Sequence, residues 1–531
     1  MLLTPRATTA ARRLCNSADV GMTQLLQACG PDHFTDSVAC KSPDNYFRVT
    51  SAGTLRFVIP FFVAGKPATS ADALTVRHPY DTQVVGETAN ATADQVEEAV
   101  AAAVAATGPA AALTAAERAG ALDEISRQLG RRAAEVAALI TAENGKPIKW
   151  ARAEVARAVS TFRWAAEEAR RFSGELQRLD TDPAAAGRIA LVRRVPRGPV
   201  LGIAPFNFPL NLVAHKVAPA LAVGAPIVLK PAPATPLTAL LLGEIMAGLD
   251  LPYGMFSILP VPNERMAALV ADPRLPVVSF TGSGPVGALI QDAVPRKHVT
   301  LELGGNAAAL VCRDWDDLGF AAQRIATFGN YQAGQSCIAV QRVLVHRDHL
   351  EAFTPLLLEA VSALRTGDPR DEATDVGPVV NEAAAERIEQ WIAEAVTAGA
   401  RVLTGGTREG TTIAPTVLTD VPADAKVTAD EVFGPVLVLT PVDSDDAGFD
   451  AINDSAFGLQ AGVFTRRLDL VFEASRRLRV GGVVIGDVPS FRADQMPYGG
   501  VKASGSGREG VASAMDDYTE PRVTVLTGVA L

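Results

Sequence analysis

The chain has 531 residues, of which 48% are hydrophobic and 20% charged, and its net charge is −10 at pH 7. This length predicts two to four structural units, and the acidic balance excludes the basic surface that a nucleic-acid-binding protein requires. Polar side chains interrupt the most apolar stretch, residues 199–229, so we expect no membrane partner. Five cysteines without a C-x-x-C pair are typical of a cytoplasmic protein and predict no metal site.

Residues 1–55 show no sustained helical or alternating pattern. We interpret them as a disordered extension that the fold does not need. The alternative is a transit peptide, because Arg6, Arg12 and Arg13 occur with Asp19 as the only acid among the first thirty residues.

Regular structure is expected from near Phe61 onward. The helix signals are capping boxes at 92–95 and 114–117, an apolar face through Val96, Val100 and Val104, and a helix end at Gly145 and Pro147. Short apolar segments that predict strands are 189–195, 200–204, 226–230, 277–280, 343–346 and 523–529. Since helical stretches separate several of these strands, the pattern indicates an α/β fold with parallel sheet.

Three side chains suggest covalent chemistry. Cys337 lies between a glycine turn and an apolar run, and its thiolate would be a strong nucleophile. Glu302 follows an apolar strand and precedes Gly-Gly, so burial would suit it to act as a general base. Asn207 is fixed between two prolines and would be a rigid donor toward an oxyanion. Taken singly, each residue also fits a structural role: core filler, buried ion pair or turn.

Two further features suggest a nucleotide site. Lys230 ends a strand, where it faces the ligand crevice of an open α/β sheet. Residues 281–287 read TGSGPVG and contain a formal G-x-G-x-x-G between a strand and a helix. Alone, this pattern would equally fit a hydroxy-acid dehydrogenase with Glu302 on the ribose, although it comes late in the chain.

The order of the motifs resembles that of the aldehyde dehydrogenase superfamily. The sequence reads, in succession, PFNFP, VLKPAPATP, FTGSGPVG, LELGGN, GQSC, EVFGPV and PYGGVKASGSGREG. These motifs extend over roughly residues 60 to 530.

The resemblance assigns roles to matching residues. Cys337 corresponds to the nucleophile, Glu302 to the general base and Asn207 to the oxyanion donor, and Lys216 matches a lysine near the active site. Residues expected to bind NAD or NADP are Phe206, Lys230, Gly282, Ser283, Glu431 and Phe433. Pro233 stands where many NAD-preferring members carry a glutamate, so the sequence leaves the choice between NAD and NADP open.

The implied fold has two Rossmann-like α/β domains and a β-arm for oligomerisation. The cofactor domain would span 56–185 and 201–305, the catalytic domain 306–510, and the arm 186–200 and 511–531. The arm implies a homodimer or a homotetramer.

The implied reaction oxidises an aldehyde to a carboxylic acid through a thiohemiacetal and a thioester on Cys337. The alternatives are a CoA-acylating enzyme, in which CoA replaces water, and a catalytically silent member of the family. The presence of Glu302 favours water.

The loop 487–500 before the PYGG motif predicts the substrate class. It places Arg492 six residues before Tyr498, and we expect both residues at the substrate entrance. A guanidinium binds carboxylate, phosphonate or sulfonate in a planar fork, which predicts an anionic aldehyde such as a semialdehyde. The alternative is a salt bridge from Arg492 to Asp487 or Asp494 that only stabilises the loop.

Overall fold

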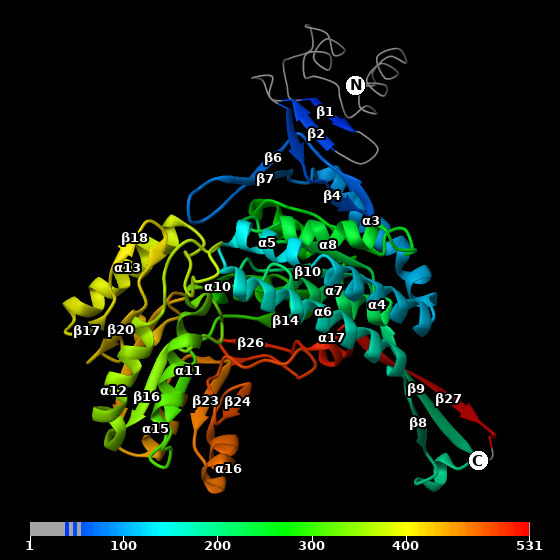
Figure 1. The fold of residues 1–531 in the computed structure, drawn as a ribbon. Helices are drawn as coiled ribbons and strands as arrows, with labels where there is room; N and C mark the ends of the chain where they lie inside the picture. Colours follow the sequence, from blue (N-terminus) through cyan, green and yellow to red (C-terminus); the bar gives the residue numbers. More distant parts are fainter. Residues whose placement is uncertain (1–37, 42–45, 50–54, 530–531) are drawn as a thin grey trace.

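The chain folds around two large sheets whose central strands run parallel, and a smaller sheet projects from the body (Figure 1). The computed structural model describes residues 38–41, 46–49 and 55–529. Helices cover the parallel strands of both large sheets. The predicted α/β class with two Rossmann-like sheets is therefore confirmed.

The first large sheet has the strand order β26-β14-β13-β10-β11-β12-β4-β5. Its strands are β4 (Phe61–Val63), β5 (Lys66–Ala68), β10 (Val200–Ile203), β11 (Ile227–Lys230), β12 (Phe256–Ile258), β13 (Val277–Thr281), β14 (His298–Glu302) and β26 (Gly505–Ser506). The strands from β14 to β12 are parallel. From β10 the chain continues to β11 on one side, and β13 lies on the other. This reversal leaves a crevice at the carboxyl ends of the strands, where ligands of open α/β sheets bind.

The helices around this sheet are α3 (Ala93–Ala112), α4 (Ala115–Arg131), α5 (Ala133–Asn144), α6 (Ile148–Arg171), α7 (Asn211–Val223), α8 (Leu237–Ala247), η3 (Asn263–Arg265), α9 (Met266–Ala271), α10 (Gly284–Ala293) and α17 (Val511–Asp517). Three of them have the starts or the end that were predicted: α3 and α4 begin, and α5 ends, at the expected residues. Both capping boxes are present, and Gly145 ends α5 in the left-handed region. The predicted valine face of α3 is wrong at Val104, which is 41% exposed, because alanines form most of the buried face.

The second large sheet has the order β17-β20-β21-β16-β15-β23-β24, and all its strands are parallel except the edge strand β17. Its strands are β15 (Ala308–Val311), β16 (Arg342–His346), β17 (Arg401–Thr404), β20 (Thr416–Thr419), β21 (Val436–Val442), β23 (Gln460–Phe464) and β24 (Gly482–Ile485). Its helices are α11 (Leu318–Asn330), η4 (Tyr331–Gly334), α12 (Arg347–Ser362), α13 (Glu382–Thr397), α14 (Lys426–Ala429), α15 (Asp445–Asn453) and α16 (Leu468–Arg477). Two small hairpin sheets pair β18 (Arg408–Glu409) with β19 (Thr412–Ile413) and β22 (Phe457–Gly458) with β25 (Val501–Lys502).

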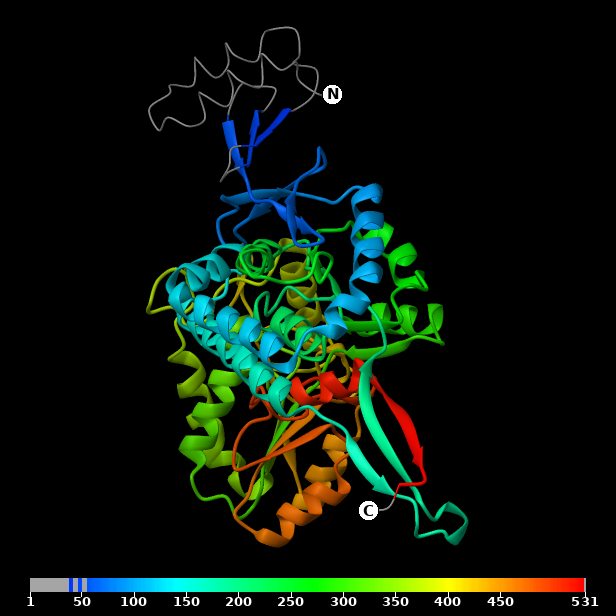
Figure 2. The same cartoon turned by 90° about the vertical axis from the view of Figure 1, so that its right-hand side faces the viewer.

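The projecting sheet corrects the predicted boundaries of the arm. It pairs β27 (Thr519–Thr527) with β9 (Arg188–Pro196) and β9 with β8 (Glu175–Arg178), and it extends away from the body (Figure 2). Val200 belongs instead to β10 of the first large sheet, and 511–517 form a helix packed on α7. The strand β8 has four exposed side chains, so no apolar pattern marked it, and only backbone pairing with β9 holds it.

A five-stranded sheet precedes the first domain in the order β1-β2-β3-β7-β6. Its strands are β1 (Val38–Lys41), β2 (Tyr46–Val49), β3 (Leu55–Val58), β6 (Ala73–Arg77) and β7 (Val84–Ala89). The expectation that residues 1–55 lack regular structure is thus wrong for 38–41 and 46–49, where hairpin-like backbone pairing outweighs the weak sequence pattern. The other residues of this predicted extension, 1–37, 42–45 and 50–54, lie outside the described part of the chain.

Within the described residues, no single helix is both long and apolar enough for a membrane span. The helices α3 and α4 meet that test only when taken together, and the chain bends by 113° between them.

The left-handed residue at the end of α5 gives a test of the fold. Gly145 has φ of 75°, and a Cβ atom there would lie 2.7 Å from Cγ of Pro378. We expect Gly145→Ala to lower stability by about 1–2 kcal/mol or more, since the backbone strain adds to the overlap. Thermal unfolding measures this change.

The matched control is Gly120→Ala in the middle of α4, where no atom lies within 4 Å of the added Cβ. This variant should gain about 0.5–1 kcal/mol. Equal stability losses in the two variants would contradict the left-handed turn at Gly145.

Candidate active site

Glu302 lies at the carboxyl end of β14, next to the segment that joins the two large sheets. Residues 303–307 carry the chain from β14 to β15. A Cβ atom on Gly304 would overlap the Glu431 carboxylate, and one on Gly305 would overlap the carbonyl oxygen of Cys337. The two glycines of LELGGN therefore allow three polar groups from distant parts of the chain to come together.

Cys337 lies in a turn after η4, and unusual backbone geometry leads into it. Gln332 and Ala333 have φ of 40° and 57°, a left-handed conformation that is rare outside glycine. The Gln335 side chain fixes this turn, since its oxygen accepts from the Val380 amide at 2.9 Å. Such strain is typical of functional sites, where the surrounding structure over-determines the backbone.

The thiol of Cys337 has one hydrogen-bond partner among the described residues, the Tyr498 hydroxyl, at 2.9 Å. Burial raises the pKa of Cys337 to about 12, whereas the hydrogen bond from Tyr498 and the charge of Arg492 oppose that rise. The predicted nucleophile is therefore a neutral thiol at rest.

Asn207 is held from both sides. Its side-chain amide donates to the carbonyl oxygen of Gln335 at 3.0 Å, which directs the amide toward the Cys337 turn. Its own carbonyl oxygen accepts from Lys146 Nζ at 2.9 Å, and Lys146 forms a fully buried ion pair with Glu154. Glu154 in turn accepts the amide of Leu210 at 2.9 Å. The ion pair thus fixes both ends of the turn that presents Asn207.

Sequence reasoning missed Lys146 and Glu154. Lys146 stands between Gly145 and Pro147, which were interpreted only as a helix end. The available signal was a lysine between a glycine and a proline. A long cationic side chain at such a constrained position is expected to have a binding partner.

Glu302 is buried, and neither of its carboxylate oxygens has a hydrogen-bond partner among the described residues. Burial and the charge of Glu509 raise the pKa of Glu302 well above its usual range. A buried carboxyl without a partner is costly. Its free oxygens suit it to exchange a proton with a bound molecule, as predicted for a general base.

Lys216 and Arg492 meet at Glu509, a residue that sequence reasoning did not identify. Lys216 Nζ lies 3.0 Å from one carboxylate oxygen of Glu509, and Arg492 donates to the other at 3.2 Å. All three side chains are buried. Lys216 also donates to the hydroxyl of Thr281 at 2.6 Å. Lys216 is thus connected to Glu302 only indirectly: it binds Glu509, whose charge acts on Glu302. Lys216 forms no hydrogen bond with Glu302 itself.

The expected alternative partners of Arg492 are corrected by the structure. Asp487 pairs with Arg324 through two bonds of 2.7 Å, and Asp494 pairs with Arg157 and His215. Arg492 instead pairs with Glu509, because the loop folds inward over Tyr498. The Arg492 guanidinium carbon lies 3.9 Å from the centre of the Tyr498 ring.

The cofactor residues predicted on the first sheet lie at its carboxyl edge. Lys230 is buried at the end of β11, and its Nζ lies 3.1 Å from the side-chain oxygen of Asn263. Burial lowers the pKa of Lys230 to about 8. Ser283 is the N-cap of α10 without a side-chain bond, and the amide of Gly282 donates to the carbonyl of Glu302. A lysine that has no carboxylate partner among the described residues, at the same sheet edge as a helix start, fits the ribose and phosphates of a dinucleotide.

The predicted residues around the nicotinamide also lie together. Glu431 accepts the amide of Gly305 at 2.8 Å, and burial raises the pKa of its carboxyl to about 7. The rings of Phe206 and Phe433 meet edge to face at 5.8 Å, and Phe433 has φ of 49°. An aromatic pair and a carboxylate with a spare oxygen fit a nicotinamide riboside.

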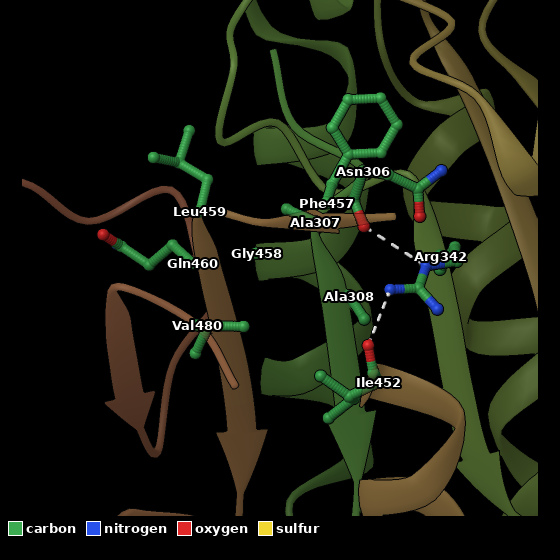
Figure 3. A pocket seen from close by; sticks show the side chains of 10 residues that line it. All are labelled: Asn306, Ala307, Ala308, Arg342, Ile452, Phe457, Gly458, Leu459, Gln460 and Val480. Atoms are coloured by element: carbon green, nitrogen blue, oxygen red, sulfur yellow. Dashed lines mark hydrogen bonds between the residues drawn. The ribbon is translucent and has the colours of Figure 1, made fainter. Parts of the chain in front are cut away.

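A small cavity behind the site has a structural explanation (Figure 3). Arg342 lies buried in its wall and donates to the carbonyl oxygens of Asn306 at 3.2 Å, Ala451 at 2.7 Å and Ile452 at 3.2 Å. Burial lowers the pKa of Arg342 to about 10. The cavity contains none of the predicted site residues, and Arg342 ties the start of β15 to the end of α15.

One group of potential metal ligands occurs among the described residues. Ligand atoms of Cys312, Asp314 and Asp445 lie within 4.8 Å of one another. Asp314 already accepts the amide of Arg466, and Asp445 accepts that of Arg313. These hydrogen bonds account for the two carboxylates without a cation.

Comparison with known proteins identifies the family. The model of the aldehyde dehydrogenase family matches residues 66–524. A 3-sulfolactaldehyde dehydrogenase from Priestia aryabhattai is 41% identical over 466 residues, which cover 88% of this chain and 97% of that protein.

Two solved structures are also similar. Aldehyde dehydrogenase 21 from Physcomitrella patens, in complex with the reaction product succinate, has a TM-score of 0.87 and 44% identity, and covers 89% of this chain and 98% of its own. The NADP-dependent glyceraldehyde-3-phosphate dehydrogenase from Bacillus halodurans, complexed with NADP, has a TM-score of 0.86 and 32% identity, and covers 89% and 100%. The chain therefore belongs to the aldehyde dehydrogenase family and is an NAD(P)-dependent oxidoreductase.

Proposed function

We propose that Cys337 is the nucleophile, Asn207 the oxyanion donor and Glu302 the general base of this aldehyde oxidation. The observation that carries the proposal is their convergence: Asn207 bonds to the turn of Cys337, and Glu302 lies beside Gly499, the neighbour of Tyr498, which touches the thiol. No other described thiol has such surroundings, since Cys312 is enclosed in the core.

The chemistry follows from these positions. The sulfur of Cys337 bonds to the aldehyde carbon, and negative charge develops on the carbonyl oxygen. One N–H of the Asn207 amide is held by Gln335, so its second N–H is available for that oxygen. A bound nicotinamide cofactor would supply the hydride acceptor for this carbon, which would leave a thioester on Cys337. The cofactor would be held by Lys230, Ser283, Glu431 and the two phenylalanines.

Glu302 completes the cycle. Its ionised carboxylate removes a proton from water, the water oxygen attacks the thioester carbon, and the carbon–sulfur bond breaks to release the acid. The unpartnered oxygens of Glu302 support water as the acceptor rather than CoA. Since the pKa of Glu302 is raised, its base form appears only as the pH rises through that raised value, and turnover should rise with it.

The charges near Cys337 support an anionic aldehyde as substrate. Lys216 and Arg492 share the single carboxylate of Glu509, and burial raises the pKa of Glu302, which disfavours a second negative charge beside them. The cluster therefore carries one cation in excess. The nearby Arg157 is paired with Asp494 and adds no net charge, but its Nε has no hydrogen-bond partner among the described residues. The three relatives compared above act on, or are bound to, molecules with a sulfonate, carboxylate or phosphate group.

The test of the site compares two variants by rapid mixing. We expect Cys337→Ala to lower turnover more than about 10³-fold and to give no burst of reduced cofactor. Glu302→Gln should give a burst of about one reduced cofactor per site and then stall, because Glu302 acts after hydride transfer. In the wild type the steady-state rate should increase from neutral to alkaline pH.

Cys312→Ala is the matched control, since it removes another described thiol outside the site, and it should keep nearly full turnover. A burst lost together with turnover in Glu302→Gln would show that Glu302 acts before hydride transfer.

The proposed substrate class is tested by the ratio of kcat/KM for succinic semialdehyde to that for propanal. Arg492→Leu should reduce this ratio roughly 10–100-fold, because a hydrogen bond to a charged group contributes about 1.5–3 kcal/mol. The ratio cancels any effect of the substitution that both substrates share. Arg324→Leu, which removes another arginine that anchors this loop through Asp487, should leave the ratio unchanged. An unchanged ratio in Arg492→Leu would contradict an anionic substrate held by this residue.

We also propose that the arm joins copies of the chain into a dimer or tetramer. Four exposed apolar side chains lie on its strands: Leu176, Val523, Val525 and Leu526. Such a surface on a projecting sheet is covered by a partner in most oligomers. We expect Val523→Asp with Val525→Asp to shift the enzyme toward monomer in analytical ultracentrifugation, and Leu468→Asp on α16 to have no such effect. A monomeric wild type would refute the proposal.

We place the enzyme in a reducing compartment such as the cytoplasm. The described cysteines Cys312 and Cys337 are both free thiols, and a thiol nucleophile requires reducing surroundings.

A further inference from the structure

The surroundings of Cys337 raise the question of how a thiolate forms there. The attacking species in thiol chemistry is the thiolate, and burial opposes its formation at Cys337. The usual remedies are an adjacent histidine, lysine or arginine, or the start of a helix. Among the described residues, none of these bonds to the sulfur: Cys337 lies in a turn, and its one hydrogen-bond partner is the hydroxyl of Tyr498.

Tyr498 is held rigidly in place. It is buried, and its backbone pairs with that of Glu509 through two hydrogen bonds of 2.9 and 2.6 Å. One face of its ring packs against the Arg492 guanidinium at 3.9 Å. Arg492 is fixed in turn by its ion pair with Glu509. The side chain of Glu509 and its backbone thus hold both members of the Tyr498–Arg492 stack.

This stack determines which atom donates the hydrogen bond. A cation over an aromatic ring favours electron density moving toward the ring, which makes the phenol a better donor and a poorer acceptor. The hydroxyl of Tyr498 has no described partner other than Cys337. The proton on the phenol therefore points at the sulfur once the thiol has lost its own proton.

We propose that Tyr498 is a catalytic hydrogen-bond donor that stabilises the Cys337 thiolate, with Arg492 as the positioning residue that keeps it a donor. The inference rests on the proposed role of Cys337 as nucleophile. Tyr498 retains its proton throughout: the thiol loses its proton to the solvent, and the O–H group then bonds to the sulfur anion. When water later attacks the thioester and the carbon–sulfur bond breaks, the same O–H group donates a hydrogen bond to the departing sulfur anion.

The test measures alkylation of Cys337 by iodoacetamide against pH in the full-length, cofactor-free enzyme, with the modified peptide quantified by mass spectrometry. Tyr498→Phe removes one oxygen atom and should raise the midpoint by about one to two pKa units, since a hydrogen bond to a charged group contributes that much. Alkylation at neutral pH should become roughly 10–100-fold slower. The steady-state rate should fall for charged and neutral aldehydes alike.

Tyr331→Phe is the matched control. Tyr331 also lies near Cys337, but its hydroxyl bonds to Ser336 at 2.7 Å. The same chemical change there should leave the alkylation midpoint unchanged. An equal shift in both variants would mean that any lost hydroxyl disturbs the pocket, and it would overturn the proposal.

A second variant keeps the proposal testable if Tyr498→Phe does not fold. Arg492→Gln keeps Tyr498 and should also raise the midpoint. The same substitution should raise it less in the Tyr498→Phe background, where only the direct effect of the Arg492 charge on the sulfur remains to be lost. Additive shifts would overturn the positioning role of Arg492, and an unchanged midpoint in Tyr498→Phe with a native unfolding temperature would overturn the role of Tyr498. Aldehyde oxidation retained by Cys337→Ala would instead refute the proposed nucleophile, so the two failures are distinguishable.

Discussion

The rest of the site depends on one constraint: the backbone at Gly304 and Gly305 lies directly against the Glu431 carboxylate and the carbonyl group of Cys337. The two glycines carry the chain from the last parallel strand of one sheet to the first strand of the other, and side chains there would overlap Glu431 and the backbone of Cys337. Glu302 and the turn of Cys337 belong to different sheets, so their separation is fixed by this junction. Any residue larger than glycine would force apart the proposed base, nucleophile and cofactor carboxylate together.

Around this junction the protein keeps ionisable groups in an interior that does not solvate them. Glu509 and Glu154 are each bound by a cation, whereas burial raises the pKa of Glu302 and so favours its protonated form. Burial of an unpaired ion costs several kcal/mol, so the neutral form of Glu302 is the more stable one at rest. Glu302 therefore becomes a proton acceptor when the pH rises or when water and substrate alter its surroundings.

The sequence allowed prediction of the groups that are proposed to react, because short motifs carry their chemistry. The alternation of apolar strands with helices also allowed prediction of parallel sheet, and the family resemblance implied two such sheets. The sequence did not identify Glu509, Lys146 or Glu154, because these residues act through partners that the fold brings from distant positions. The same reason explains the wrong partners expected for Arg492: neighbours in sequence were considered, whereas the inward fold of the loop delivers Glu509. The strand β8 was missed because its side chains are all exposed.

The residue proposed to bind the substrate's anionic group and the residue proposed to stabilise the thiolate lie on one segment of the chain. The loop that carries Arg492 and Tyr498 continues into β26, which pairs with β14 directly beside Glu302, and then reaches Glu509. A displacement of Arg492 would be transmitted to the Tyr498 ring packed against it and from there to the sulfur of Cys337. Since Glu509 holds Arg492 with one oxygen and Lys216 with the other, an anion that competes for Arg492 would also change the charge that Glu302 experiences. The proposed anion-binding residue Arg492 and the proposed base Glu302 are thus linked through a single buried carboxylate, so on the proposed function the selectivity and the rate would not be independent properties.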